Sequence, residues 1–317
     1  KRNAQVTLKQ TKAYRQAVQT QVISNIANMY YTLMMLDRQL EITKSTAEIL
    51  KKNAETMEAM KDAAMYNINS TGVEQSKAAY AQVLASIPDI EQSIRETENA
   101  LSTFLGEAPH AIKRGTLEAQ VLPTELSAGV PIQLLSNRPD VKAAEMALAS
   151  CYYNTNSARA AFYPQITLSG SAGWTNSAGS AIINPGKFLA SAVGSLTQPL
   201  FNRGQVVAQY RIARAQQEEA ALGFQQTLLN AGSEVNDALI AYQTSQGKRI
   251  LLDKQITSLQ TALRSTTLLM EHGNTTYLEV LTSRQSLLSA QLSQTANHFT
   301  EIQSLINLYR ALGGGQE

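Results

Sequence analysis

Two long stretches of the chain place apolar residues at alternating spacings of four and three. Such spacing repeats every seven residues and is typical of helices that pack side by side at a shallow angle. The first series is Val22, Ile26, Met29, Leu33, Leu36 and Leu40, and the second is Leu252, Ile256, Leu259, Leu263, Thr266 and Met270. The pattern therefore predicts two regions of long, closely packed helices.

The distribution of Gly and Pro gives the extent of these regions. Residues 1–71 contain neither residue, and no proline follows Pro199. Because Gly and Pro are the main breakers of regular structure, two long helical zones flank a broken middle. Each zone has a glycine near its centre (Gly72 and Gly273) and closes on a Leu-Gly pair, a common helix end. We expect a mainly α fold with two antiparallel hairpins of very long coiled helices.

The middle of the chain changes period. A helix is expected from Pro139, followed by strands at about 164–176 and 187–198, the first with apolar or small residues on one face and Gln, Thr and Ser on the other. Strands of about ten residues are long enough to cross a bilayer as part of a tilted barrel. A soluble hairpin packed on helices fits the alternation equally well. In the membrane interpretation, the outward-facing side chains are Ile166, Leu168 and Trp174.

The internal repeat divides the chain into three parts. Residues 1–108 are expected to be the second part of a first structural repeat, forming one helical hairpin. Residues 109–138 are a proline-containing linker or equatorial segment. Residues 139–317 are a second structural repeat, with the two strands and the other hairpin.

Composition excludes several classes of function. There are 27 basic and 25 acidic residues without a clustered basic face, so nucleic acid is not an expected partner. A single cysteine excludes an internal disulfide or a multi-cysteine metal site, and the three histidines are far apart in sequence. Phosphate-binding loops and a nucleophile elbow are missing from the sequence. We expect no cofactor, no metal site, no catalytic residue and no enzymatic activity.

Several motifs together resemble the TolC family of outer-membrane channels, and most closely its lipoprotein branch, which includes NodT, OprM and CusC. The matching segments cover essentially the whole chain: Arg138-Pro139-Asp140-Val141, residues 157–164, residues 198–204, residues 273–281 and residues 309–315. The resemblance implies a homotrimer in the outer membrane of a Gram-negative bacterium. Each family subunit gives four strands to one twelve-stranded barrel, and its helices form a periplasmic tunnel.

Only the second strand pair of that pattern is found here. The chain opens on Lys1 without Met, inside a helical pattern, so we expect that the natural N-terminus, with the lipid-bearing Cys of this branch, is missing. The resemblance implies the channel component of a tripartite efflux system. Such a channel is a passive exit duct for drugs, toxic compounds or metal ions, and its partners are a periplasmic adaptor, an inner-membrane pump and outer-membrane lipid.

Family members contact their adaptors, and close their aperture, at the tips of the helical hairpins. By match, the corresponding residues are Asn69, Ser70, Thr71, Gly72, Gly273, Asn274, Thr275, Thr276 and Glu279. Three copies of Glu279 in a ring would favour cations. The other interpretation is that Glu279 is an ordinary solvated helix residue.

Three alternative functions stay open from the sequence. The same channel could serve type I protein secretion. A periplasmic adaptor also contains long helical hairpins, although adaptors place one hairpin between β-rich domains. A soluble coiled-coil scaffold is the third, and the alternating segment argues against it.

Overall fold

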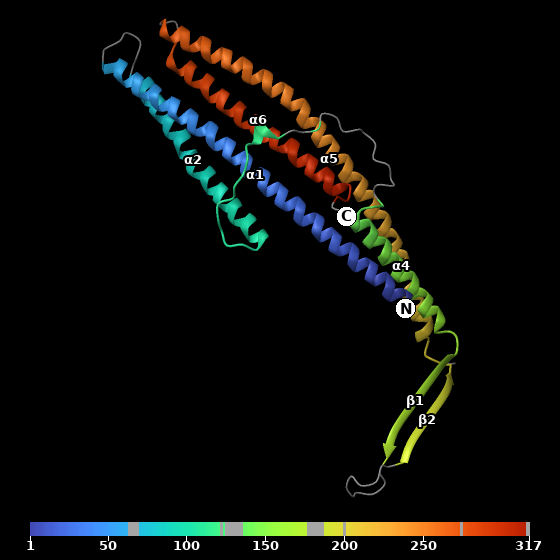
Figure 1. Cartoon of the computed structure of the whole chain (residues 1–317). Helices are drawn as coiled ribbons and strands as arrows, with labels where there is room; N and C mark the ends of the chain where they lie inside the picture. Colours follow the sequence, from blue (N-terminus) through green and yellow to red (C-terminus); the bar gives the residue numbers. More distant parts are fainter. Residues whose placement is uncertain are drawn as a thin grey trace, which may run out of the picture. The chain divides into compact units, whose positions relative to one another are not determined.

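The computed structural model describes residues 1–62, 70–120, 123, 136–175, 187–198, 201–272 and 275–314. Its elements are α1 (Arg2–Asp62), α2 (Ser70–Leu105), η1 (Leu117–Ala119), α4 (Pro139–Ala160), β1 (Gln165–Thr175), β2 (Lys187–Thr197), α5 (Gln205–Glu271) and α6 (Tyr277–Ala311) (Figure 1). The longest helix, α5, has 67 residues. At 1.5 Å per residue it is about 100 Å long. The predicted mainly α fold with two long hairpins and one strand pair is confirmed.

The chain forms two compact units. The first comprises residues 1–15 and 139–229, and the second comprises residues 16–138 and 230–317. These units interleave in sequence, whereas the expected parts 1–108, 109–138 and 139–317 follow the internal repeat. That three-part division therefore stays a prediction, and the two units are described separately below.

In the second unit, the heptad pattern forms the contact between α1 and α2. Leu33 and Leu36 of α1 are buried against Ile94 and Leu101 of α2. Burying a leucine or isoleucine side chain contributes roughly 1.5–3 kcal/mol, so a few such layers outweigh the modest propensity of the residues themselves. Pro88 lies inside α2 and has no N–H to donate, so this continuous helix lacks one of its backbone hydrogen bonds.

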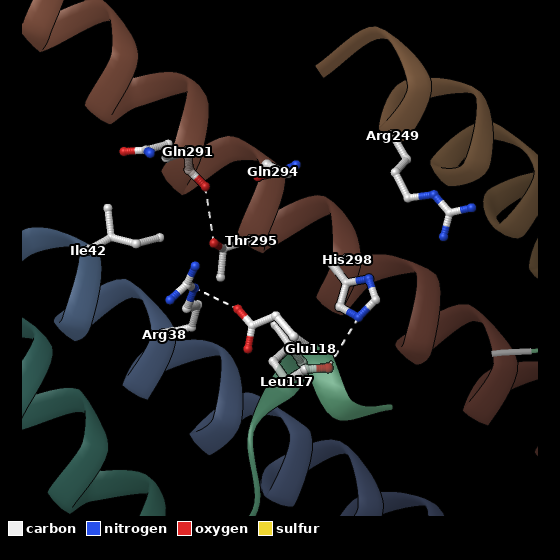
Figure 2. A pocket seen from close by; sticks show the side chains of 9 residues that line it. All are labelled: Arg38, Ile42, Leu117, Glu118, Arg249, Gln291, Gln294, Thr295 and His298. Atoms are coloured by element: carbon white, nitrogen blue, oxygen red, sulfur yellow. Dashed lines mark hydrogen bonds and ion pairs between the residues drawn. The ribbon is translucent and has the colours of Figure 1, made fainter. Parts of the chain in front are cut away.

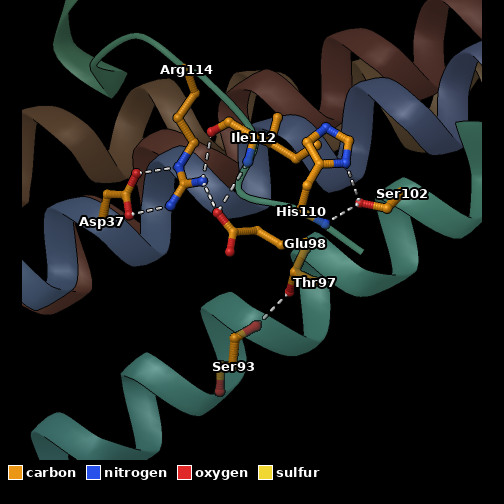
Figure 3. A network of polar contacts seen from close by, with 8 residues as sticks. All are labelled: Asp37, Ser93, Thr97, Glu98, Ser102, His110, Ile112 and Arg114. Atoms are coloured by element: carbon orange, nitrogen blue, oxygen red, sulfur yellow. Dashed lines mark hydrogen bonds and ion pairs between the residues drawn. The ribbon is translucent and has the colours of Figure 1, made fainter. Parts of the chain in front are cut away.

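A segment that we call the strap, residues 106–120, follows α2 and is anchored by a charged network (Figure 3). Arg114 Nε and Nη2 donate to Asp37 of α1 at 2.5 and 2.8 Å, and Arg114 Nη1 donates to Glu98 of α2 at 2.5 Å. The hydrogen bond to Asp37, and then that to Glu98, raise the pKa of Arg114 above its ordinary value. Leu117 is buried with Met34 of α1 and Ile302 of α6. The strap therefore contacts both hairpins.

Arg138, the first residue of the Arg-Pro-Asp motif, contacts the C-terminal end of α6. The buried Arg138 donates to the carbonyl of Ala311 at 2.9 Å and to Glu234 of α5 at 2.7 Å, which supplies a partner to the end of α6. Gly313 follows with φ +76°, and a Cβ there would lie 3.1 Å from Arg138 Cα. Arg138 and Gly313 thus have a structural role at the end of the second hairpin.

In the first unit, side-chain hydrogen bonds join α4 to its neighbours. Asn3 of α1 donates to Asn154 at 2.9 Å and accepts from Ser150 at 2.7 Å. Thr155 donates to the carbonyl of Ala213 of α5 at 3.1 Å. Polar bonds therefore supplement the sparse apolar contacts of this helix.

The same unit contains the strand pair, in which β1 runs antiparallel to β2. Ile166 stands opposite Leu196, and Thr167 stands opposite Ser195. Since opposed residues share a face, the register joins the apolar positions on one face and the hydroxyl positions on the other. Val193 departs from this alternation because it stands opposite Ser169 on the polar face.

Within the described residues, no helix combines the length and the apolar character needed to cross a membrane.

Candidate functional site

The predicted tip residues lie at the starts of two helices. Ser70 and Thr71 begin α2 and are exposed, and Gly72 follows half-buried in the same turn. Thr275 and Thr276 directly precede α6, in which Glu279 lies in the first turn. The predicted residues outside the described part of the chain are Asn69, Gly273 and Asn274.

The structure brings these two helix starts together through residues just behind them. Val73 of α2 and Tyr277 of α6 are buried in one cluster with Met57 of α1. The hydroxyls of Ser76 and Tyr277 are 3.1 Å apart in a buried hydrogen bond. Because a buried hydroxyl is costly without a partner, this bond fixes the register of α2 against α6. Ser76 was not predicted, since a single serine within a helix carries no signal of a distant partner.

Glu279 is exposed at the N-terminal end of α6. Its backbone N–H donates to the carbonyl of Thr276 at 3.2 Å, and its carboxylate forms no ion pair among the described residues. A negative charge in the first turn of a helix is favourable, because the unpaired N–H groups there carry partial positive charge. This geometry fits both the solvated helix residue and a member of a ring.

Two further charged residues at this end of α1 and α2 form an ion pair. Lys77 Nζ lies 2.6 Å from Glu58 Oε1. The hydrogen bond from Lys77, together with its charge, holds the pKa of Glu58 below its ordinary value, and the same bond raises the pKa of Lys77. The pair joins the two helices of the first hairpin.

Arg284 is an unexpected cation within the packing of α6 against the first hairpin. It lines a small cavity with Leu50 of α1 and Val83 of α2. Its Nε is buried without a hydrogen bond among the described residues, and burial lowers the pKa of Arg284. Sequence periodicity gave no indication of this placement.

A wider groove runs between α2 and α6, with a volume of about 490 Å³. Its walls carry small and larger side chains together, with Ser86 of α2 and Ser289 and Ser293 of α6 beside Val83, Leu288 and Leu292.

The third cavity has a volume of about 300 Å³ and lies between α1, the strap, α5 and α6 (Figure 2). Arg38 of α1 lies 2.6 Å from Glu118 of the strap, and His298 Nε2 of α6 is 3.3 Å from the carbonyl of Leu117. Arg249 of α5 also lines this cavity. Among the described residues, no group of three or more metal-ligating side chains gathers here or elsewhere.

The strand pair exposes the predicted apolar face. Leu168 is 85% exposed and Ile166 is 76% exposed, with Leu196 beside them on β2. The backbone of Trp174 belongs to β1, whereas its side chain lies outside the described residues. Large exposed aliphatic side chains that share a face mark a surface that other apolar groups cover.

Comparison with known proteins gives a consistent result. Residues 130–314 match the outer membrane efflux protein family. The cation efflux system protein CusC of Escherichia coli K12 is 28% identical over 306 residues, which are 96% of this chain and 66% of that protein. The pyoverdine export outer membrane protein OpmQ of Pseudomonas putida KT2440 is 30% identical over 304 residues, 95% of this chain and 63% of that protein. The chain thus spans about two thirds of the length of these relatives.

Solved structures resemble the chain over nearly its whole length. The outer-membrane channel OprN superposes with a TM-score of 0.91 at 25% identity, over 99% of this chain and 71% of that one. The outer membrane protein VceC of Vibrio cholerae superposes with a TM-score of 0.88 at 26% identity, over 99% of this chain and 75% of that one.

Proposed function

Because the chain belongs to the outer membrane efflux protein family, we propose that it is part of the outer-membrane channel of a tripartite efflux system. The channel would be a passive exit duct for small molecules. The observation that carries this proposal is the likeness to outer-membrane channels over almost the whole chain, strand pair included. This likeness favours a channel over an adaptor or a coiled-coil scaffold.

The strand pair supports assembly into a barrel with other strands. An isolated two-stranded ribbon is at best marginally stable in water, and both of its edges offer unpaired backbone groups. Here one face is apolar and exposed and the other is rich in hydroxyls, as where lipid lies on one side and water on the other. We propose that three copies supply strands to one barrel, with Ile166, Leu168 and Trp174 toward lipid.

The two long hairpins support a tunnel whose ends contact other proteins. We propose that the periplasmic adaptor docks near the starts of α2 and α6, at the exposed Ser70, Thr71 and Glu279. The groove between these helices begins farther along them, at Gln82 and Gln285. In a homotrimer, three Glu279 carboxylates would then surround the aperture and favour cations. Energy for transport would come from the inner-membrane pump, so this chain would need no catalytic residue.

The cargo is proposed only as a class. Among the relatives, CusC is named for cation efflux and OpmQ for pyoverdine export, and a third relative, TtgI of Pseudomonas putida, is named for a toluene efflux pump. These names favour small molecules and ions over the proteins of type I secretion. They differ too much to select one compound.

Export from cells tests the proposal. A strain that lacks the gene for the full-length protein is expected to accumulate a fluorescent efflux substrate. Reintroducing the full-length gene is expected to restore export of that substrate. The charge-neutral double change Ile166→Asp with Thr167→Lys, on the strand pair, should abolish rescue. If the deletion strain accumulated several chemically different substrates only to the level of the wild-type strain, this result would argue against an efflux duct.

A further inference from the structure

The carboxylate of Glu301 in α6 is among the most buried polar groups of the second unit. The side chain is 1% exposed, and neither carboxylate oxygen accepts a hydrogen bond from the described residues. Burying a carboxylate is costly unless it is paired and hydrogen-bonded. Charges close by can offset this cost, and two groups are in position to do so.

One of these groups is permanently charged and the other is titratable. Arg249 Nη1 of α5 lies 3.6 Å from Glu301 Oε1, and Nδ1 of His298, one turn earlier in α6, lies 3.8 Å from Glu301 Oε2. Arg249 is about half exposed, so part of its charge is screened by water. The imidazole is mostly buried, so water screens a charge on it less.

The second nitrogen of His298 decides how the ring responds to pH. Nε2 faces the carbonyl of Leu117 at 3.3 Å. A carbonyl only accepts, so Nε2 carries the proton of a singly protonated ring, and the lone pair of Nδ1 then faces the Glu301 carboxylate. A second proton, on Nδ1, turns this contact from repulsive to attractive and gives the ring a positive charge.

We propose that His298, Glu301 and Arg249 form a proton-operated latch that ties α6 to α5 and to the strap. With two protons, the His298 ring bridges the carboxylate of Glu301 and the carbonyl of Leu117. With one proton, it keeps the strap and loses the carboxylate. The latch then holds less firmly, because only the half-exposed Arg249 still compensates the buried charge.

The surrounding charges are consistent with this assignment. From α5, Tyr242 is buried, and burial together with the charge of Glu301 raises the pKa of Tyr242. From the strap and α1, Glu118 and Arg38 compensate each other at 2.6 Å. Neither Tyr242 nor the pair of Arg38 and Glu118 offers Glu301 a further cation.

The latch matters for the proposed function because of what the strap contacts. Arg114 fixes the strap to α1 and α2, while Leu117 and His298 join it to α6. Acid conditions would therefore hold the two hairpins together more firmly than neutral ones. This consequence rests on the proposed channel, whereas the latch itself does not.

The test is thermal unfolding of the full-length protein at a series of pH values between about 5 and 8, the range in which histidine ordinarily titrates. The wild type is expected to melt at a lower temperature at the upper end of this range than at its lower end, because the contact between Nδ1 and the Glu301 carboxylate is attractive only with a proton on Nδ1. His298→Gln keeps a donor for the carbonyl of Leu117 and cannot gain charge. The part of the pH dependence of the melting temperature that comes from His298 should therefore be lost in this variant.

His110→Gln is the matched control. His110 also lies three residues from a glutamate, with Nε2 3.5 Å from Glu107, but both side chains are about half exposed. This variant should keep the wild-type dependence on pH. Equal slopes for wild type and His298→Gln would overturn the latch.

A second variant covers the case in which His298→Gln does not fold. Glu301→Gln removes the buried charge at nearly constant shape and should also flatten the pH dependence, whereas an unchanged slope would count against the latch. None of these measurements needs transport. Failure of export with the slopes as expected would therefore overturn the channel and leave the latch standing.

Discussion

Replacing Arg114 by Met should loosen the strap far more than replacing Arg38 by Met. Both arginines bridge two carboxylates, but Arg114 is 13% exposed and Arg38 is 37% exposed. Loss of Arg114 leaves Glu98, itself mostly buried, without its guanidinium partner. Breaking a buried pair costs roughly 3–5 kcal/mol, and the partial exposure of Asp37 lowers this to about 3 kcal/mol. An exposed pair such as that of Arg38 contributes about 0–1 kcal/mol.

Hydrogen exchange followed by mass spectrometry measures this difference locally. The amide of Ile112 donates to Glu98, and that of Gly115 donates to the hydroxyl of Tyr30, so both report on opening of the strap. A loss of about 3 kcal/mol should speed their exchange on the order of 100-fold in Arg114→Met, while Arg38→Met should change it by less than about fivefold. Similar small effects in both variants would refute the reasoning that burial, and not the number of ion pairs, secures the strap.

Three further predictions concern the ends of the hairpins. Glu279→Gln should weaken the cation preference of single-channel currents in planar bilayers, and Glu271→Gln, which removes an exposed carboxylate from the end of α5, should not; equal selectivity in both would demote Glu279 to an ordinary helix residue. Gly313→Ala should lower stability by about 1–2 kcal/mol in thermal melts, because the backbone of Gly313 has a positive φ. Gly223→Ala, within α5 and with open space around it, should raise stability by about 0.5–1 kcal/mol. A change of the same sign in both variants would contradict this account. Lys77 lowers the pKa of Glu58 in the folded state, so the pair stabilises the fold at pH values above the pKa of Glu58 in the unfolded chain. This contribution is lost as pH falls through the folded-state pKa. Glu58→Gln should therefore reduce the fall of melting temperature on acidification, and an unchanged fall would count against this account.

Much of the fold was predictable because burial repeats along the chain. Leu33 and Leu36, taken from the heptad pattern, are core residues of the first hairpin. The strands were predicted within one or two residues, since their alternation is local and Gly-rich or Pro-containing segments flank them. In these elements, the signal and the structure depend on the same short stretch of sequence.

The candidate site was less predictable because its contacts join distant residues. Ser76 and Tyr277 are 201 positions apart, and Arg114 reaches Asp37 across 77. Most of the strap belongs to residues 109–138, which looked like a plain linker because their three prolines indicate only an interrupted backbone. Which of its side chains is buried depends on where α1, α2 and α6 lie, and no local pattern contains that information.

Pro88 makes the two hairpins mechanically unequal. The carbonyl four residues before it, that of Leu84, has no proline N–H to accept, so α2 contains a gap in its hydrogen-bond ladder. Neither α5 nor α6 contains a proline. Under a bending load, the first hairpin would yield at this one joint, while the second would spread the same load over its whole length.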